Sequence, residues 1–305
     1  MSGEVKALLA AFIWALTIIV FTDQTRRLST LSLNAVRGLF GVLFLVAVVP
    51  FTGVVGELRH MSVATAIAML GSGILVFAVA DSLYFFSLRS LGASLAVPIT
   101  ESGYPLLTFL MALLWVDESF SPLFLVGAGL IVVGVILLTG ASPRPAASEA
   151  DAIADAVPAS PAHPVHWRSG LPCAAGAAFL WALATVWIKA ESGNLGPAAA
   201  SLLRTVPAVL LLVPLARFSP RGLHLRDYRR IDIIGSAFAG TMGMGLAGLL
   251  HVAAIQEAGA ARASILTATI PVFTLPLAVV FLREAITLGV VVGTVACVVG
   301  IWFVV

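Results

Sequence analysis

Long apolar stretches follow one another along almost the whole chain, separated by short polar connections. A stretch of about 20 apolar residues is the length that crosses a bilayer as a helix. Glycine and proline are scattered through these stretches, as membrane-spanning helices tolerate. The pattern predicts ten transmembrane helices, at residues 7–22, 31–50, 62–88, 91–116, 120–139, 170–189, 196–216, 231–255, 258–282 and 286–304.

One stretch between the predicted helices has a different composition. Residues 140–166 contain five prolines, three acidic residues and no aromatic residue. Such a stretch cannot bury an apolar core, so we expect a disordered linker rich in proline and alanine. The chain is therefore divided into a first part at 1–140, a linker at 141–167 and a second part at 168–305, with five predicted helices in each part.

The two parts repeat each other. The run Phe12-Ile-Trp-Ala-Leu16 returns 167 residues later as Phe179-Leu-Trp-Ala-Leu183, and the same separation relates Arg37 to Arg204. Further along, after the loss of one residue, a separation of 166 relates matching prolines, glycines and glutamates. Matches that include rare tryptophan, arginine and proline at one separation indicate an internal duplication.

An odd number of helices in each repeat has a topological consequence. After five helices, the second repeat must enter the membrane from the opposite side to the first. Inverted repeats are typical of secondary transporters, which place the substrate site near mid-membrane between the halves. We therefore predict an all-α integral membrane protein, with ten transmembrane helices arranged as two inverted five-helix repeats around a central cavity.

The composition agrees with a chain that has lipid as its solvent. Hydrophobic residues make up 60% of the chain and charged residues 10%, and the mean hydropathy is +1.07. A soluble domain carries about a quarter charged residues. The net charge of +2 gives no reason to expect a nucleic-acid partner. Cys173 and Cys297 lie in apolar stretches, and we expect small buried side chains there instead of a disulfide or a metal site.

Five pairs of residues hold equivalent positions in the two repeats. They are Trp14 and Trp181, Arg37 and Arg204, Gly92 and Gly259, Pro105 and Pro271, and Glu118 and Glu284. In these residues, their order and their duplication, the sequence resembles the EamA-type ten-helix transporters of the drug/metabolite transporter superfamily. The resemblance covers both repeats. It implies a ten-helix bundle with a central cavity that carries small metabolites such as amino acids, often outward.

Glu101 places a carboxylate in the middle of an apolar stretch, between Pro98 and Pro105. An ionisable group at such depth is costly, so it usually faces a partner or a water-filled cavity. Its counterpart in the second repeat is Thr267. The two prolines predict a broken helix, which is tolerated only beside a cavity or buried protein. We expect Glu101 to line the cavity, where it could bind a substrate amino group or carry a proton; a glutamate that only fixes helix packing is the alternative.

Asp81 and Tyr84 share one predicted helical face and stand opposite Gly248 and His251 of the second repeat. A substrate is seldom two-fold symmetric, so positions at which the repeats differ are expected to shape the binding site. This places Asp81 at the cavity, with a possible role in proton coupling. In the alternative, Asp81 lies near a helix end, close to water, and pairs with Arg89.

The matched arginines and tryptophans have two interpretations each. Arg37 and Arg204 could reach for a substrate carboxylate, but matched pairs more often serve the scaffold, so we favour bonds to backbone carbonyls or to a neighbouring carboxylate. Trp14 and Trp181 could stack on a substrate, or fill a core. The predicted cavity residues are Asp81, Tyr84, Glu101, Tyr104, His251 and Thr267, supported by Arg37, Arg204, Trp14 and Trp181.

Little in the sequence indicates an enzyme. There is no zinc-binding HExxH motif, and Leu70 spoils the GxSG pattern around Ser72. Only His251 could serve as a base within a predicted helix. No P-loop is present, so ATP does not drive transport within this chain. We expect no cofactor and no metal. Glu118 and Glu284 are expected to cap a neighbouring helix start or to pair with basic residues.

These observations together predict a secondary transporter in the cell (plasma or inner) membrane. The resemblance implies export of amino acids or related polar or amphipathic compounds by alternating access; a flippase for lipid or lipid-linked cargo with the same fold is the alternative. The expected partners are a small-molecule substrate and membrane lipids, with no nucleic acid, for a monomer or weak homodimer. The five arginines of residues 217–230 predict a cytoplasmic loop and both termini outside, whereas the resemblance implies termini inside.

Overall fold

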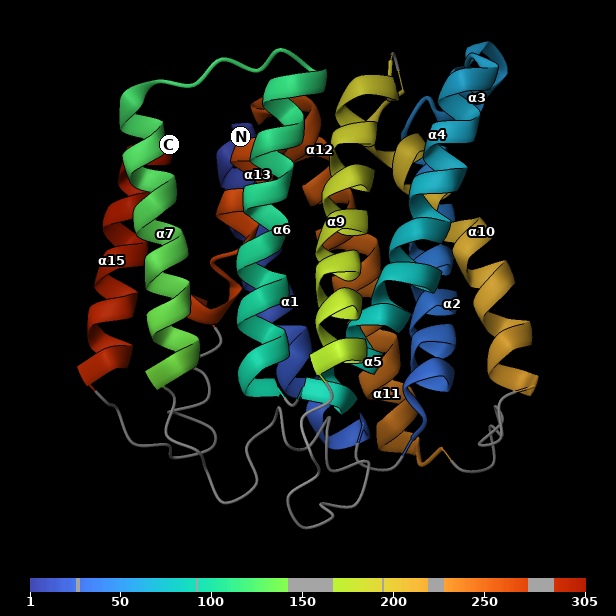
Figure 1. Ribbon diagram of the computed structural model, residues 1–305. Coiled ribbons are helices and arrows are strands. Elements are labelled where there is room, and N and C mark those ends of the chain that lie inside the picture. Colours follow the sequence, from blue (N-terminus) through green and yellow to red (C-terminus); the bar gives the residue numbers. More distant parts are fainter. Residues whose placement is uncertain (26–27, 92, 142–166, 194, 219–227, 274–287) are drawn as a thin grey trace.

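The chain is all-helical in the computed structural model (Figure 1). The structure describes residues 1–25, 28–91, 93–141, 167–193, 195–218, 228–273 and 288–305. The predicted linker lies almost entirely outside these residues, so its disorder stays a prediction. Both termini lie at the same end of the bundle (Figure 1).

The first half of the chain forms the helices predicted for it, with two additions. Its elements are α1 (Gly3–Thr25), α2 (Thr30–Val48), the 3₁₀ turn η1 (Val49–Phe51), α3 (Val54–His60), α4 (Val63–Ile74), the π-helix η2 (Leu75–Ala80), α5 (Asp81–Leu91), α6 (Ala93–Trp115) and α7 (Pro122–Ala141). Elements α4, η2 and α5 follow one another directly and occupy the span predicted at 62–88. The short helix α3 and the π-helix are not anticipated by the hydrophobic pattern.

The second half follows the same order. Its elements are α9 (Trp167–Glu191), α10 (Pro197–Phe218), α11 (Arg230–Phe238), the π-helix η4 (Ala239–Ala247), α12 (Gly248–Ala258), α13 (Ala260–Thr267) and α15 (Leu288–Val304). Elements α11, η4 and α12 are continuous, as α4, η2 and α5 are in the first half. A π-helix therefore lies in the third predicted span of each half.

Five helical runs among the described residues are long and apolar enough to cross a membrane. They are Leu31–Phe51, Val63–Tyr84, Trp167–Glu191, Pro197–Phe218 and Arg230–Ala258. Shorter apolar helices lie at Pro122–Leu137, Ala260–Phe273 and Val291–Val304. Large apolar side chains lie on the outer surface, and Trp302 is 82% exposed, whereas the buried interior is rich in alanine. This distribution suits a lipid-embedded bundle, because membrane helices associate through small residues.

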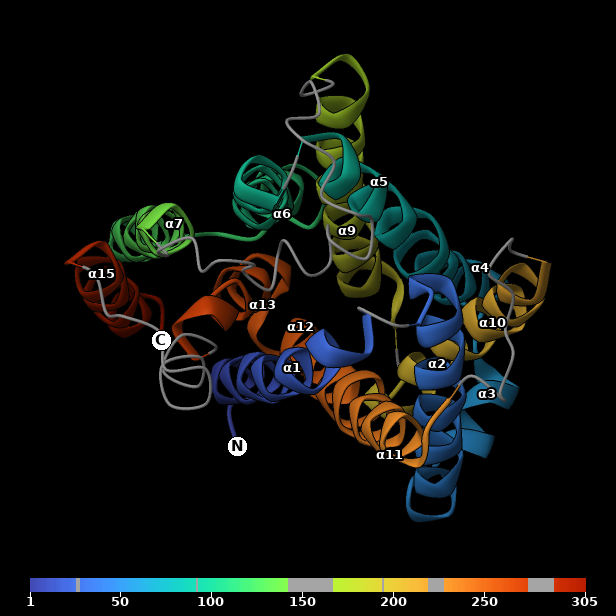
Figure 2. The same cartoon turned by 90° about the horizontal axis from the view of Figure 1, so that it is seen from below.

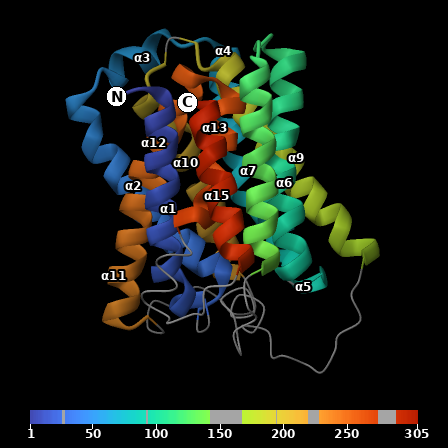
Figure 3. The same cartoon turned by 90° about the vertical axis from the view of Figure 1, so that its left-hand side faces the viewer.

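The helices of the two halves pack in matching ways. Helix α1 contacts η4, α12 and α13, and its counterpart α9 contacts η2, α5 and α6. In Figure 1, α1 descends from the N-terminus while α9 ascends, so the first helices of the two halves run in opposite directions. Helix α2 packs against α10 on one side of the bundle, and α7 against α15 on the other (Figures 2 and 3).

Glycines bring α7 and α15 into close contact. A Cβ at Gly127 would lie 2.7 Å from the carbonyl oxygen of Gly300, and a Cβ at Gly134 would lie 2.7 Å from that of Gly293. Only a residue without a side chain lets the two backbones approach to this distance. Cys297 is buried in the same interface. Both cysteines are free, and Cys297 is buried as predicted, whereas Cys173 is partly exposed.

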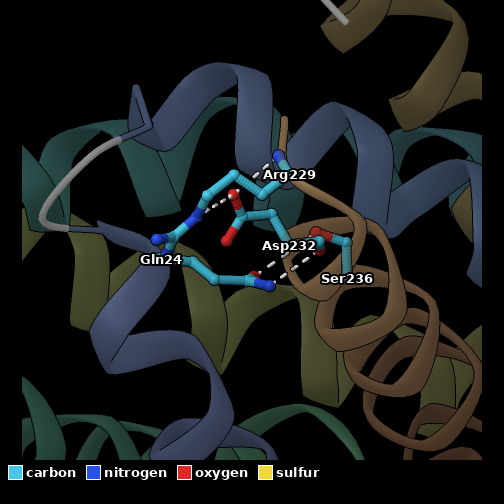
Figure 4. A network of polar contacts seen from close by, with 4 residues as sticks. All are labelled: Gln24, Arg229, Asp232 and Ser236. Atoms are coloured by element: carbon cyan, nitrogen blue, oxygen red, sulfur yellow. Dashed lines mark hydrogen bonds and ion pairs between the residues drawn. The ribbon is translucent and has the colours of Figure 1, made fainter. Parts of the chain in front are cut away.

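A polar network ties the end of α1 to the start of α11 (Figure 4). Gln24 donates from Nε2 to the carbonyl oxygen of Asp232 at 2.7 Å and accepts a bond of 3.3 Å from the hydroxyl of Ser236. The carboxylate of Asp232, only 1% exposed, accepts a bond of 2.9 Å from the backbone N–H of Arg229. This bond gives an acceptor to a backbone N–H at the start of α11, where the helix itself provides none.

The prediction that Pro98 and Pro105 break their helix is wrong. Helix α6 continues from Ala93 to Trp115 through both prolines. Membrane helices accommodate proline when hydroxyl groups and neighbouring helices stabilise the surrounding turns. The hydroxyl of Thr108 donates to the carbonyl oxygen of Tyr104 at 2.8 Å, one turn earlier.

The corresponding helix of the second half is interrupted instead. Helix α13 ends at Thr267, residues 268–269 form a turn, and one more helical turn follows at 270–273. The hydroxyl of Thr269 donates to the carbonyl oxygen of Leu266 at 2.6 Å. The interruption therefore directly follows Thr267, the counterpart of Glu101.

Candidate functional site

The indole of Trp181 lies within a group of polar and aromatic side chains that both halves contribute. Its Nε1 donates a hydrogen bond of 3.2 Å to Oδ1 of Asp81. Its ring centroid lies 5.4 Å from that of Tyr84 and 6.3 Å from that of Tyr104. Because Trp181 belongs to α9 and the other three residues to α5 and α6, the group forms only when the two halves pack together.

Tyr104 extends this group toward α13. Its phenol oxygen lies 3.2 Å from Oγ1 of Thr185 and also interacts with Thr267. Glu101, three residues earlier on the same helix, interacts electrostatically with Tyr104 and with Asp81. Two carboxylates thus interact electrostatically in a region that also holds aromatic rings, a combination that suits a cationic group.

Trp14 forms a second group, related to the first by the sequence repeat. Its Nε1 donates to the carbonyl oxygen of Gly243 in η4 at 3.0 Å, and its ring lies 5.2 Å from the imidazole of His251. Trp14 precedes Trp181 by 167 residues, and Tyr84 precedes His251 by the same number. The tryptophan of each half thus packs against the equivalent position of the other half.

The two arginines have different partners. Arg37 on α2 donates from Nη2 to Oδ1 of Asn34 at 2.9 Å, and its charge interacts with that of Asp81. Arg204 on α10 donates from Nε to the hydroxyl of Ser72 on α4 at 3.0 Å. One of the matched arginines thus bonds to a residue of its own helix, and the other bonds to a residue of the opposite half.

Two buried polar atoms lie on the Arg204 side of the site without a hydrogen-bond partner among the described residues. They are Oγ of Ser201 and Nδ1 of His251. Ser201 lies one turn before Arg204 on α10, and His251 interacts electrostatically with Arg204. Buried polar groups in proteins are normally hydrogen-bonded. The two atoms thus retain bonding capacity that a small molecule could use.

Hydrogen bonds, ring contacts and electrostatic interactions join the predicted site residues. Asp81 follows η2 directly at the start of α5 and is held by Trp181, so it does not stand at a water-facing helix end. The side chain of Arg89, its alternative partner, lies outside the described residues. The residues in these contacts are Trp14, Arg37, Asp81, Tyr84, Glu101, Tyr104, Trp181, Arg204, His251 and Thr267.

Sequence reasoning missed three residues of this region. Ser72 accepts the bond from Arg204, Thr185 meets Tyr104, and the ring of Phe77 lies 6.0 Å from the Arg204 guanidinium carbon. The small residues around Ser72 signal a close helix contact, and Thr185 lies one turn after Trp181 on the same face. The π-helices that carry or precede several of these residues have no comparable sequence signal.

Glu118 caps a neighbouring helix, which confirms its predicted role. Its carboxylate accepts bonds of 2.7 Å and 3.3 Å from the backbone N–H groups of Ala260 and Ala261, at the start of α13. Gly259 provides the turn before this helix with a φ of +97°, a conformation that favours glycine. The matching residue Glu284 lies outside the described part of the chain.

A small polar pocket of about 230 Å³ lies where α6 leads into α7 and α12 leads into α13. Ion pairs between the halves flank it, joining Lys6 to Glu257 and, at 3.2 Å, Arg262 to Glu4. The pocket is separate from the tryptophan groups. It is lined by Glu118, Ser119, Phe120, Lys189, Glu257, Ala258, Gly259 and Arg262.

The comparison with known families decides the identity of the fold. The model of the EamA-like transporter family matches residues 1–140 and 168–305. The chain belongs to this family. It is therefore a multi-pass membrane protein of a transporter family, and this family is not one of enzymes. The resemblance inferred from the duplicated residues is confirmed.

Two individual proteins are similar over nearly the whole chain. An uncharacterized transporter of Archaeoglobus fulgidus is 26% identical over 289 residues, which cover 94% of this chain and 92% of the relative. A crystal structure of a protein superposes with a TM-score of 0.76 at 17% identity, and covers 99% of this chain and 95% of the other. At that identity the structural match establishes the fold alone.

Proposed function

We propose that this protein is a secondary transporter that exports amino acids or related polar and amphipathic metabolites across the cell membrane by alternating access. The observation that carries the proposal is the linked polar and aromatic cluster contributed by both halves, in which Trp181 of one half bonds Asp81 of the other. A ligand held at such a cluster is contacted by both halves, so their relative movement changes its access to either side.

The architecture we infer is ten transmembrane helices in two inverted five-helix repeats around a central cavity. The opposite directions of α1 and α9 (Figure 1) and the matching contacts of the two halves support it. The family match at 1–140 and 168–305 falls on either side of the proline-rich segment and adds further support. In this scheme the protein needs only substrate and lipids as partners, and acts as a monomer or weak homodimer.

The chemistry of the cluster suits an amphipathic molecule that carries an amino group. Asp81 and Glu101 offer two carboxylates that could bind an ammonium group, and the rings of Trp181, Tyr84 and Tyr104 offer an apolar and π-rich surface. Either carboxylate could also take up a proton during the transport cycle, which would couple export to a proton gradient.

Thermal stability of the detergent-purified protein tests the function directly. The panel contains amino acids, decarboxylated amines, nucleosides, sugars and lipid extracts. A compound at 100 times its dissociation constant stabilises the folded state by about 2.7 kcal/mol. Stabilisation by amino acids, followed by their counterflow in proteoliposomes, is the expected result. Stabilisation by lipid alone, with lipid scrambling in vesicles, would replace the exporter with a flippase.

A further inference from the structure

We propose that Arg204, and not its counterpart Arg37, binds the carboxylate of the transported molecule, while the ammonium group of the same molecule lies at Asp81 and Glu101. This inference rests on the proposed amino-acid transport. It adds the orientation of the substrate and names the residue that selects for a carboxylate. The difference between the two arginines carries the argument.

Arg37 is engaged by groups of its own half. Its Nη2 donates to Oδ1 of Asn34 at 2.9 Å, and the nearby carboxylate of Asp81 balances its charge. An intramembrane arginine with an amide and a carboxylate nearby has the partners that such a charge requires. Arg37 therefore fits the structural role predicted for a matched pair.

Arg204 is more deeply buried than Arg37, and no acidic side chain among the described residues balances its charge. The residue is 8% exposed, and its one hydrogen bond to a described residue runs from Nε to Ser72. The terminal nitrogens of the guanidinium thus have no acceptor in the described part of the chain. The bond from Nε and the ring of Phe77, 6.0 Å from the guanidinium carbon, fix the orientation of the group. A fixed guanidinium with free terminal donors matches the two oxygens of a carboxylate.

The repeat comparison shows how the second half loses the internal partner. Asn34 of the first half corresponds to Ser201 of the second, 167 residues later. The shorter serine side chain does not reach its arginine, and Oγ of Ser201 is buried, at 3% residue exposure, without a partner among the described residues. The substitution leaves both a guanidinium and a hydroxyl with bonding capacity on one face of α10.

His251 supplies a third group on the same side. Its Nδ1 is buried without a partner among the described residues, and the ring interacts electrostatically with Arg204. A carboxylate beside Arg204 can accept a bond from Ser201 and from an Nδ1–H of His251. One anionic group would therefore satisfy all three side chains.

The ammonium group of the substrate would lie at the acidic residues Asp81 and Glu101. Tyr104 interacts electrostatically with both Glu101 and Arg204, so this residue lies within the electrostatic reach of the acidic and the basic part of the site. Asp81 interacts electrostatically with Glu101 and accepts a hydrogen bond from Trp181. An α-amino acid carries its ammonium and carboxylate on one carbon, which suits acidic and basic groups separated by a single side chain.

The test compares Arg204→Gln with the matched control Arg37→Gln. Binding is measured as thermal stabilisation, and transport as counterflow in proteoliposomes. Leucine is compared with isopentylamine and phenylalanine with phenethylamine, because each amine lacks only the carboxylate of its amino acid. We expect Arg204→Gln to weaken amino-acid binding roughly 10- to 150-fold, the range of a hydrogen bond to a charged group. Binding of the amines is expected to stay unchanged. Arg37→Gln is expected to lower stability but to retain the preference for the amino acid over the amine.

Retention of the wild-type preference in Arg204→Gln, or its loss in Arg37→Gln alone, would overturn the inference while leaving amino-acid transport intact. Failure of the wild-type protein to bind any amino acid would instead overturn the proposed function, and this inference with it. If Arg204→Gln does not fold, Ser201→Ala provides the test. Its hydroxyl has no hydrogen-bond partner among the described residues, so we expect its removal to leave the fold intact. Weaker binding of amino acids but not of amines supports the inference, and unchanged binding of both overturns it.

Discussion

The backbone of Gly73 lies so close to Arg204 that a Cβ at position 73 would be 1.9 Å from the carbonyl oxygen of the arginine. The repeat reproduces this contact. Gly240 follows Gly73 by 167 residues, and a Cβ there would be 2.3 Å from the carbonyl oxygen of Arg37. Each arginine-bearing helix is thus in backbone contact with a glycine of the opposite half.

Replacing either glycine by alanine should force the halves apart. The new methyl group would meet backbone, which cannot rotate away as a side chain can. We therefore expect Gly73→Ala to lower the free energy of unfolding by at least about 1–3 kcal/mol, the usual cost of an overpacked core. The measurement is the thermal unfolding midpoint in detergent, together with transport. Gly129→Ala is the control, since no described residue beyond its own helical turn lies within 4 Å of its added Cβ. It should leave the midpoint unchanged or raise it, and an equal loss in both variants would contradict the packing argument.

The cap at the start of α13 predicts a graded loss of stability. Glu118→Ala removes the acceptor for the N–H groups of Ala260 and Ala261 and should cost about 1 kcal/mol, the usual contribution of a helix cap. Glu118→Gln keeps an acceptor but loses the charge, so its loss should be smaller. Thermal unfolding of the two variants in parallel checks the order. Equal midpoints for both variants and the wild type would show that the cap contributes nothing measurable.

Glu101 is expected to carry the proton if export is proton-coupled. The carboxylate of Asp81 is held by Trp181 and lies near Arg37, whereas Glu101 has no hydrogen bond or ion pair to its carboxylate among the described residues. Glu101→Gln should therefore abolish the response of flux to a pH gradient in proteoliposomes. Asp81→Asn should weaken substrate binding and keep that response. Intact pH-driven flux in Glu101→Gln would show that Glu101 does not carry the coupling proton.

The two ion pairs near the N-terminus should affect how readily the two halves separate there more than they affect the unfolding midpoint. Lys6 with Glu257, and Glu4 with Arg262, join α1 to α12 and α13 across the halves. Partly exposed pairs contribute about 0–1 kcal/mol, so the double variant Glu4→Gln/Glu257→Gln should unfold at nearly the wild-type midpoint. A Ser119→Cys reporter in the adjacent pocket should react faster with a maleimide in this variant. Unchanged labelling would mean that these pairs do not restrain this end.

The hydropathy pattern and the internal repeat predict much of this fold, because both can be read from residue types and their spacing alone. The spans follow the lengths of the apolar stretches, and equivalence of Trp14 with Trp181 anticipates their equivalent packing. The prolines of α6 mislead, because the sequence does not show which turns neighbouring groups stabilise. The pairing of Arg204 with Ser72 joins residues 132 apart, and no local pattern encodes such a contact.

The two π-helices give the bundle a way to turn side chains without breaking a helix. A π-helical turn holds more residues than an α-helical turn. If η2 tightened by one residue into α-helix, everything beyond it would swing by about 100° around the helix axis. Asp81 stands first after η2, and His251 stands four residues after η4. A twist of this kind in each π-helix would carry Asp81 and His251 around their helix axes, so the site could exchange its contacts by rotation without breaking either helix.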